Sequence, residues 1–222
     1  MNPKLTLGSL FDGSGGFPLA AIKTGIKPLW ASEVEPFPIR VTQKNLPQVK
    51  HLGDIKDIVG SKIEPVDIIS FGSPCQDLSI AGKRAGLEGK KSNLFYEAIR
   101  VIKEMRCKTN GKYPRYLLWE NVPGAFSSNK GEDFRCVLEE ITRIKDSTVK
   151  FPRPSRWQSA GEILGDNFSL AWRVLDAKYF GVPQRRRRIF LVADLDGGSS
   201  REILFEQKSM SGDTSEGCEK GK

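Results

Sequence analysis

Short apolar runs alternate along this chain with segments in which apolar residues recur at the spacing of an α-helix. The runs have the length and composition of β-strands, and turn-forming residues bound most of them. Strands are expected at residues 5–11, 28–32, 66–71, 116–119, 170–177 and 188–193, with a weaker one at 48–52. Helices are expected at residues 18–24, 37–45, 93–105 and 134–144. Strands that alternate with helices build sheets covered on both faces, so the pattern predicts an α/β fold with a doubly wound, mostly parallel sheet.

Two segments depart from this alternation. Residues 145–167 are rich in Pro, Ser, Arg and Gly, and we predict an insertion or a long loop there. Residues 195–222 lose all periodicity beyond a short apolar run at 203–205, and we expect a polar tail. The predicted domain therefore covers residues 1–194, and its last two strands are spaced for a hairpin around 181–183.

The composition is that of one globular domain with a basic surface. The 222 residues suffice for a sizeable core, and 38% of them are hydrophobic. A formal charge of +8 favours a polyanionic partner, with nucleic acid first. No apolar run reaches the roughly 18 residues of a membrane span, and the N-terminus lacks the pattern of a signal peptide. We therefore expect a cytoplasmic protein.

The cysteines and the single histidine do not form a metal-binding pattern. The sequence contains no Cys-x-x-Cys pair, so neither a zinc site nor a disulfide is expected. A Ser-His-Asp hydrolase would need His51, and no nucleophile-elbow serine is present for it to serve.

Reactive residues gather after four of the predicted strands, where open parallel sheets bind their ligands. The first strand runs into a turn at 12–16, and the second ends at Glu33. The third runs into Cys75, and the fourth into Glu120. The agreement among four separate strand ends predicts an active site at this edge of the sheet.

The first two strand ends indicate a site for a nucleoside. Gly13, Gly15 and Gly16 let the backbone approach a ligand closely and open a helix N-terminus. Glu33, about 20 residues further on, is positioned to accept hydrogen bonds from ribose hydroxyls. The spacing is not Gly-x-Gly-x-x-Gly, and a tight strand-to-helix turn without a ligand is the alternative.

Cys75 follows a proline in the loop after the third strand, where a thiolate would act as a nucleophile. The alternative is a buried, inert cysteine, which is our interpretation of Cys107 and Cys136. Residues 80–91 contain three glycines and four basic residues. This composition is typical of a mobile loop that closes over a phosphate backbone, or of an ordinary solvated loop.

Two further groups complete the candidate chemistry. Glu120 is a candidate acid, with a salt-bridge partner or helix-cap neighbour as the alternative. Four arginines at 185–188 lead into the last buried strand, so alternate side chains face opposite sides. Arg186 and Arg188 then share a face and can hold a carbonyl oxygen or a phosphate, unless the run is only a solvated patch.

Taken in this order, the pieces resemble the motifs of the DNA (cytosine-5) methyltransferase family. They are SLFDGSGGF at 9–17, GSPCQDLS at 72–79, ENV at 120–122 and QRRRRIF at 184–190. The resemblance covers about residues 5–194 and implies the Rossmann-like fold of the S-adenosylmethionine-dependent methyltransferases.

The resemblance also implies roles. S-adenosylmethionine would be held by Phe11, Gly13, Gly15, Gly16, Glu33, Val34, Asp54, Ile55 and Leu94. Cys75 would attack carbon 6 of a flipped-out cytosine, and Glu120 would protonate its N3. Arg188, with Arg186 nearby, would hold the O2 oxygen. The DNA would be contacted by Gln76, Ser79, Lys83 and Arg84, and no metal is implied.

The family pattern continues with a target-recognition region and later motifs that this match does not contain. We expect residues 195–222 to be the start of that region. Four interpretations stay open for a bacterial or phage chain of this kind, with or without an accompanying restriction enzyme. It is one subunit of a split methyltransferase completed by a second chain, a truncated remnant, a non-catalytic cofactor- or nucleic-acid-binding module, or an RNA methyltransferase.

Overall fold

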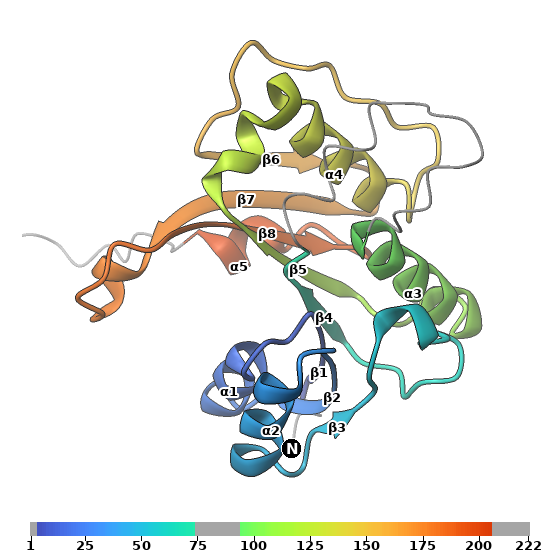
Figure 1. Cartoon of the computed structure of the whole chain (residues 1–222). Helices are drawn as coiled ribbons and strands as arrows, with labels where there is room; N and C mark the ends of the chain where they lie inside the picture. The colour runs from blue at the N-terminus through green and yellow to red at the C-terminus, as the bar shows by residue number, and fades with distance from the viewer. Residues whose placement is uncertain (1–3, 74–93, 206–222) are drawn as a thin grey trace, which may run out of the picture.

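A computed structural model describes residues 4–73 and 94–205. One eight-stranded sheet runs through this part in the order β3-β2-β1-β4-β5-β8-β7-β6 (Figure 1). Its strands are β1 Thr6–Leu10, β2 Lys27–Ser32, β3 Lys50–His51, β4 Ile68–Phe71, β5 Tyr116–Asn121, β6 Ala160–Leu164, β7 Ser169–Asp176 and β8 Arg187–Asp194. The first five are mutually parallel, and β8, β7 and β6 follow in antiparallel pairs. Because β7 runs in the direction of the first five, the prediction of a mostly parallel sheet is confirmed.

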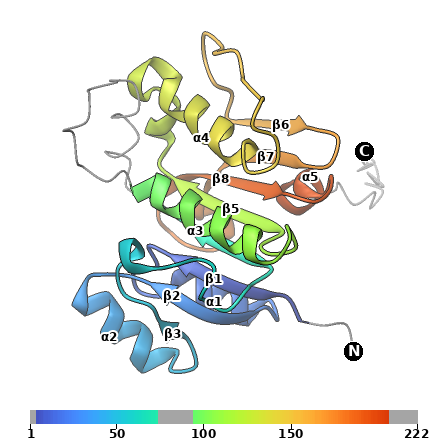
Figure 2. The same ribbon diagram turned by 90° about the vertical axis from the view of Figure 1, so that its right-hand side faces the viewer.

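Helices cover both faces of this sheet. They are α1 Gly16–Lys23, α2 Pro36–Asn45, α3 Leu94–Lys108, α4 Glu132–Thr142 and α5 Ser200–Leu204. Figures 1 and 2 show α3 and α4 on one face and α1 and α5 on the other. Short 3₁₀ turns add η1 Ile55–Asp57, η3 Pro123–Phe126, η4 Ser128–Gly131 and η5 Ala177–Phe180. The predicted doubly wound α/β fold is confirmed.

The core under α3 follows from the alternation of side chains along the central strands. Leu117 and Trp119 of β5 are fully buried, as are Ile69 and Phe71 of β4. Residues two apart on a strand share a face, so these four side chains make one apolar surface. Phe95 of α3 is buried against it, with its ring centroid 6.2 Å from that of Phe71. This packing fixes the strand ends that carry the candidate chemistry.

The segment at 145–167 is not only a long loop, which corrects the sequence prediction. Residues 160–164 form β6 and pair with β7 at the edge of the sheet. The strand AGEIL was not recognised because its side chains are only partly buried and it contains a glycine. Gly161 is required by its neighbour, since a Cβ there would lie 2.2 Å from the Trp172 ring. An edge strand of this kind carries little hydrophobic signal.

Part of the segment expected to be a polar tail is helical, and residues 206–222 of it lie outside the described residues. Residues 200–204 form α5, and Ser200 is buried against the β7–β8 pair. This helix is short, which explains why its periodicity escaped the sequence analysis. The predicted hairpin is confirmed, since β7 and β8 pair from Ser169–Asp194 to Asp176–Arg187.

None of the helices in the described ranges, 4–73 and 94–205, is long and apolar enough to cross a membrane. Within the same ranges, no cluster of three or more His, Cys, Asp or Glu side chains is arranged to hold a metal ion.

Candidate active site

The predicted strand ends meet at one edge of the sheet. The side on which the chain adds strands changes between β1 and β4. The strands β2 and β3 are added on one side of β1, and β4 and β5 are added on the other. Open α/β sheets bind ligands at such a switch point, beyond the carboxyl ends of the strands. Asp12, Ser73 and Glu120 therefore lie at the same edge, although they are far apart in the sequence.

The turn after β1 has the backbone conformation that its glycines predict. Gly13 and Gly15 have φ of 58° and 87°, in the left-handed region that favours glycine. Phe11 also has a positive φ, 56°, which is uncommon for a bulky residue and typical of a constrained functional turn. No atom of the described residues lies within 4 Å of the position that a Cβ on Gly13 would occupy. The turn therefore leaves open space where a ligand can meet the backbone.

Glu33 joins the ends of β1 and β2. Its Oε2 accepts the backbone N–H of Gly13 at 2.8 Å. Its Oε1 accepts those of Val34 and Glu35 at 2.8 and 3.0 Å. Backbone amides hold the carboxylate in one orientation, and Oε2, which accepts a single N–H, keeps a further lone pair for a donor from a ligand.

The end of β3 is tied to the end of β2. The Ser32 hydroxyl donates to the carbonyl of Gly53 at 2.7 Å. Asp54 caps η1 by accepting the N–H of Lys56, while Ile55 is buried in the core. The structure thus brings together the predicted residues from β1, β2 and β3. Leu94 is the first residue of α3 and packs partly buried against the core, further along the sheet.

Asp12 is a residue of this edge that the sequence analysis missed. Its side chain is 6% exposed, and within the described part of the chain neither carboxylate oxygen has a hydrogen-bond partner. Burial raises the pKa of Asp12 to about 6, helped by the charge of Glu33 and partly offset by the nearby Ser9 hydroxyl. An acidic residue inside a glycine turn, directly after a buried strand, was the available signal.

Cys75, Gln76, Ser79, Lys83 and Arg84 lie outside the described residues. The structure does describe Gly72 and Ser73, which lead toward them. Asn121, at the end of β5, donates from its amide nitrogen to the carbonyl of Ser73 at 3.1 Å. Its amide oxygen accepts the N–H of Val122 at 2.8 Å. Asn121 thus fixes the chain two residues before Cys75, a role that the sequence did not reveal.

Glu120 is held beside that same segment by two arginines. Arg188 Nε lies 3.0 Å from Glu120 Oε1, and Arg186 Nη2 lies 3.8 Å from the same atom. A Cβ on Gly72 would come within 3.2 Å of Glu120 Oε2, so the carboxylate lies directly against the chain three residues before Cys75. The described structure therefore gathers a carboxylate and two guanidinium groups beside the chain segment, Gly72 and Ser73, that leads to the predicted nucleophile.

A hollow of about 340 Å³ opens at this cluster. Its lining is Glu120, Leu175, Ala177, Phe180, Arg186, Arg188 and Phe190. The lining combines a carboxylate and two guanidinium groups with apolar side chains, a composition that suits a flat heterocycle with polar edges. We call this space the Glu120 pocket.

The fold is that of solved methyltransferases. The Dnmt2 methyltransferase of S. pombe has a TM-score of 0.62 over 95% of this chain and 58% of its own, at 19% identity. A putative DNA modification methyltransferase encoded within an E. coli prophage has a TM-score of 0.59 over 86% and 47%, at 20% identity. These likenesses define a Rossmann-like fold of the methyltransferase type.

The family is shown by the sequence. The profile of the family described as "C-5 cytosine-specific DNA methylase" matches residues 5–151 and 154–215. The chain therefore belongs to the C-5 cytosine-specific DNA methylase family.

Two curated relatives carry names with different activities. A "DNA N-6-adenine-methyltransferase" of Escherichia phage P1 is 35% identical over 91% of this chain and 30% of its own length. The "Type II methyltransferase M.NlaIV" of Neisseria lactamica is 32% identical over 89% of this chain and 42% of its own. The chain spans less than half the length of either relative.

Proposed function

We propose that this chain carries the catalytic centre of an enzyme that transfers a methyl group from S-adenosylmethionine to carbon 5 of cytosine in DNA. The observation that carries the proposal is the Glu120 cluster. A carboxylate paired with Arg188 and Arg186 lies against Gly72, three residues before the cysteine of GSPCQDLS. We further propose a bacterial or phage enzyme acting on cytoplasmic DNA, as part of a restriction-modification system or as an orphan.

The residues at the β1–β3 ends fit the proposed cofactor. The open space at Gly13 suits a ligand that approaches the backbone, and the remaining lone pair of Glu33 Oε2 suits a ribose hydroxyl. Asp54 and Ile55 would contact the adenine, with Val34 and Leu94 as apolar neighbours. Phe11, Gly15 and Gly16 would shape the turn around the methionine part of the cofactor. When bound, the cofactor would supply an electrophilic methyl group.

The chain's own residues would supply the activation that cytosine needs. Carbon 5 is a poor nucleophile until carbon 6 is attacked, and the Cys75 thiolate would make that attack. The attack places negative charge on the ring, which a proton from Glu120 at N3 and the Arg188 guanidinium at O2 would stabilise. Once carbon 5 has accepted the methyl group, loss of its proton to a base would expel the thiolate and restore the ring.

A cysteine nucleophile is informative about the target atom. The exocyclic amine of adenine carries its own nitrogen nucleophile, so its methylation requires no covalent attack on the ring. A thiol, a carboxylate and two guanidinium groups at one strand edge match the demands of a ring carbon instead. We therefore favour cytosine over the adenine named for the phage P1 relative.

Product analysis would test the proposal. The chain is incubated with isotopically labelled S-adenosylmethionine and mixed-sequence duplex DNA, and the digested nucleosides are identified by mass spectrometry. Label in 5-methylcytosine is the expected result. Label in N6-methyladenine, or label found in RNA and absent from DNA, would refute it. Equal turnover by the Cys75→Ser variant would refute the mechanism.

A further inference from the structure

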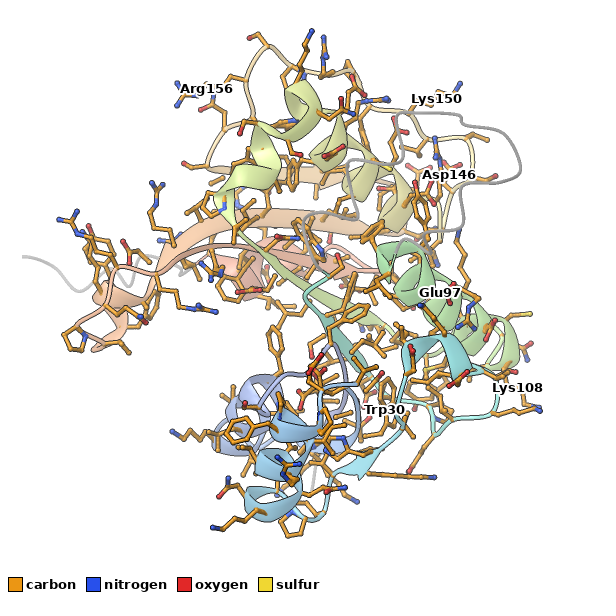
Figure 3. All side chains as sticks on the ribbon, viewed as in Figure 1. Trp30, Glu97, Lys108, Asp146, Lys150 and Arg156 are labelled. Atoms are coloured by element: carbon orange, nitrogen blue, oxygen red, sulfur yellow. The ribbon has the colours of Figure 1, made fainter. Side chains whose placement is uncertain are left out.

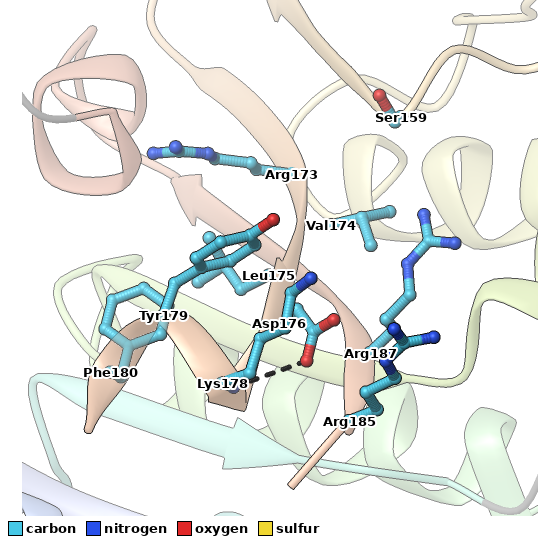
Figure 4. A pocket seen from close by; sticks show the side chains of 10 residues that line it. All are labelled: Ser159, Arg173, Val174, Leu175, Asp176, Lys178, Tyr179, Phe180, Arg185 and Arg187. Carbon is cyan, nitrogen blue, oxygen red and sulfur yellow. Dashed lines mark hydrogen bonds between the residues drawn. The ribbon is translucent and has the colours of Figure 1, made fainter. Parts of the chain in front are cut away.

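Only two of the four arginines at 185–188 belong to the Glu120 cluster. Arg186 and Arg188 approach Glu120, while Arg185 and Arg187 point elsewhere. They help to line a second hollow, of about 710 Å³, on the outer edge of the β7–β8 hairpin. We call it the outer hollow. Its lining is Ser159, Arg173, Val174, Leu175, Asp176, Lys178, Tyr179, Phe180, Arg185 and Arg187 (Figure 4).

The outer hollow exists because β6 stops short of the hairpin tip. The β6–β7 pairing ends at Ala160–Arg173, followed by one bond from Val174 N–H to the carbonyl of Ser159. Beyond this point, within the described part of the chain, the outer edge of β7 has no strand beside it. Figure 4 shows Arg185 and Arg187 on one side of β7 and Arg173, with the Tyr179 and Phe180 rings, on the other.

The charge in the outer hollow is unbalanced. Four cations, Arg173, Lys178, Arg185 and Arg187, line it with one carboxylate, Asp176. None of the four cations forms an ion pair with any residue of the described ranges. Asp176 accepts backbone N–H groups of Lys178 and Arg186, at 3.3 and 3.1 Å, so it serves the turn. Arg173 and Lys178 lie over the rings of Phe205 and Tyr179, which leaves their charge unneutralised. Cations gathered in a concave surface without carboxylate partners favour an anionic ligand.

Two further features select nucleic acid over a small anion. Tyr179 and Phe180 are 76% and 58% exposed at the rim, and exposed aromatic rings beside cations are typical of nucleic-acid surfaces. The second feature is continuity, because Leu175 and Phe180 line both the outer hollow and the Glu120 pocket. A strand whose base enters the Glu120 pocket therefore carries its neighbouring phosphates past this shared wall.

We propose that the outer hollow binds the sugar-phosphate backbone of the DNA strand whose base enters the Glu120 pocket. The hairpin then separates two tasks: Arg186 and Arg188 face the base, and Arg185 and Arg187, with Arg173 and Lys178, hold the flanking phosphates. This proposal rests on the proposed function for the identity of the strand.

The salt dependence of DNA binding tests it. Each neutralised phosphate contributes a slope of about 0.9 to log K against log salt. The double variant Arg185→Gln/Arg187→Gln is therefore expected to reduce the slope by about 2 and to weaken binding about tenfold or more at low salt. Binding is measured by fluorescence anisotropy with ordinary duplex DNA and no cofactor, so the result does not depend on catalysis.

A matched control removes the same charge elsewhere. Lys108 and Lys112 are exposed around the end of α3, and Figure 3 shows Lys108 on the opposite side of the molecule from the hairpin. Lys108→Gln/Lys112→Gln is expected to keep the parent slope. Equal slopes for the parent and the arginine variant would overturn the proposal, as would equal losses in both double variants.

Three more outcomes distinguish this proposal from a free-anion site and from the proposed function. Saturable binding of inorganic phosphate that the arginine variant loses, with an unchanged DNA slope, would assign a free-anion site and overturn the backbone role. Absence of DNA binding by the parent chain would overturn both this proposal and the proposed function. A reduced slope together with methylated adenine would sustain the backbone role while the proposed function fails.

Discussion

The two ends of the candidate active site hold a carboxylate in opposite ways. At the β1–β2 end, Glu33 is fixed by three backbone N–H groups. At the β5–β8 end, Glu120 is held by two guanidinium side chains. Backbone donors keep their position whatever the side chains do, whereas arginines can exchange one partner for another. The first end is therefore suited to binding an unchanging ligand, and the second to a group whose charge changes during a reaction.

Asp12 sharpens this contrast. It lies at the backbone-built end, is buried and has no hydrogen-bond partner in the described ranges, while Glu120 remains partly exposed beside two cations. An unpaired buried carboxylate costs folding free energy. The β1–β2 end thus contains a destabilising charge, and the β5–β8 end a compensated one.

The largest expected effect is at the arginine-held end. Glu120→Gln keeps the shape of the side chain and removes the proton donor, so turnover should fall by about 10²–10³-fold while DNA affinity changes little. Single-turnover rates and anisotropy measure the two quantities. Glu162→Gln on β6 serves as the control: it breaks the 3.0 Å ion pair with Arg201 of α5 and should leave both quantities near the parent values. Equal losses in rate and affinity for Glu120→Gln would indicate a structural role.

A smaller effect, on stability, is expected at Asp12. Since burial raises its pKa from 3.8 to about 6, the native state binds the proton more tightly than the unfolded state. The free energy of unfolding therefore falls as pH rises from about 4 to 6, by about 3 kcal/mol in total. Asp12→Asn should remove this fall and be more stable than the parent above pH 6.

Urea unfolding of the parent and of Asp12→Asn between pH 4 and 8 would measure this difference. Asp57→Asn, at an exposed carboxylate of η1, is the control and should follow the parent curve. A constant difference between Asp12→Asn and the parent at every pH would contradict the assigned titration.

The smallest effect concerns the backbone-held carboxylate. Glu33→Gln keeps one acceptor oxygen and loses the charge, so the affinity for S-adenosylhomocysteine should fall about tenfold. Titration calorimetry gives the dissociation constant, with Glu35→Gln, two residues away and exposed, as the control. An unchanged affinity would show that Glu33 serves only to join β1 to β2.

Local sequence pattern was enough to predict the central strands, because they are buried runs with clear turn signals. It was not enough for β6, whose half-exposed side chains carry little hydrophobic contrast. Alternation along β8 predicted that Arg186 and Arg188 would act together, and the structure brings both to Glu120. The outer hollow could not be predicted, since Arg173 joins it through the register of a neighbouring strand. The missing partners of Asp12 likewise depend on tertiary contacts.

The central claim is that Cys75 attacks carbon 6 of cytosine beside Glu120. Its most direct test is covalent capture of duplex DNA containing 5-fluorocytosine, in the presence of S-adenosylmethionine, read as a denaturant-resistant band. Because fluorine replaces the hydrogen at carbon 5, the base has no proton to remove there. The thioether between Cys75 and the ring should therefore persist. The account predicts an adduct with the parent chain and none with Cys75→Ser. An adduct that persists in Cys75→Ser would contradict it.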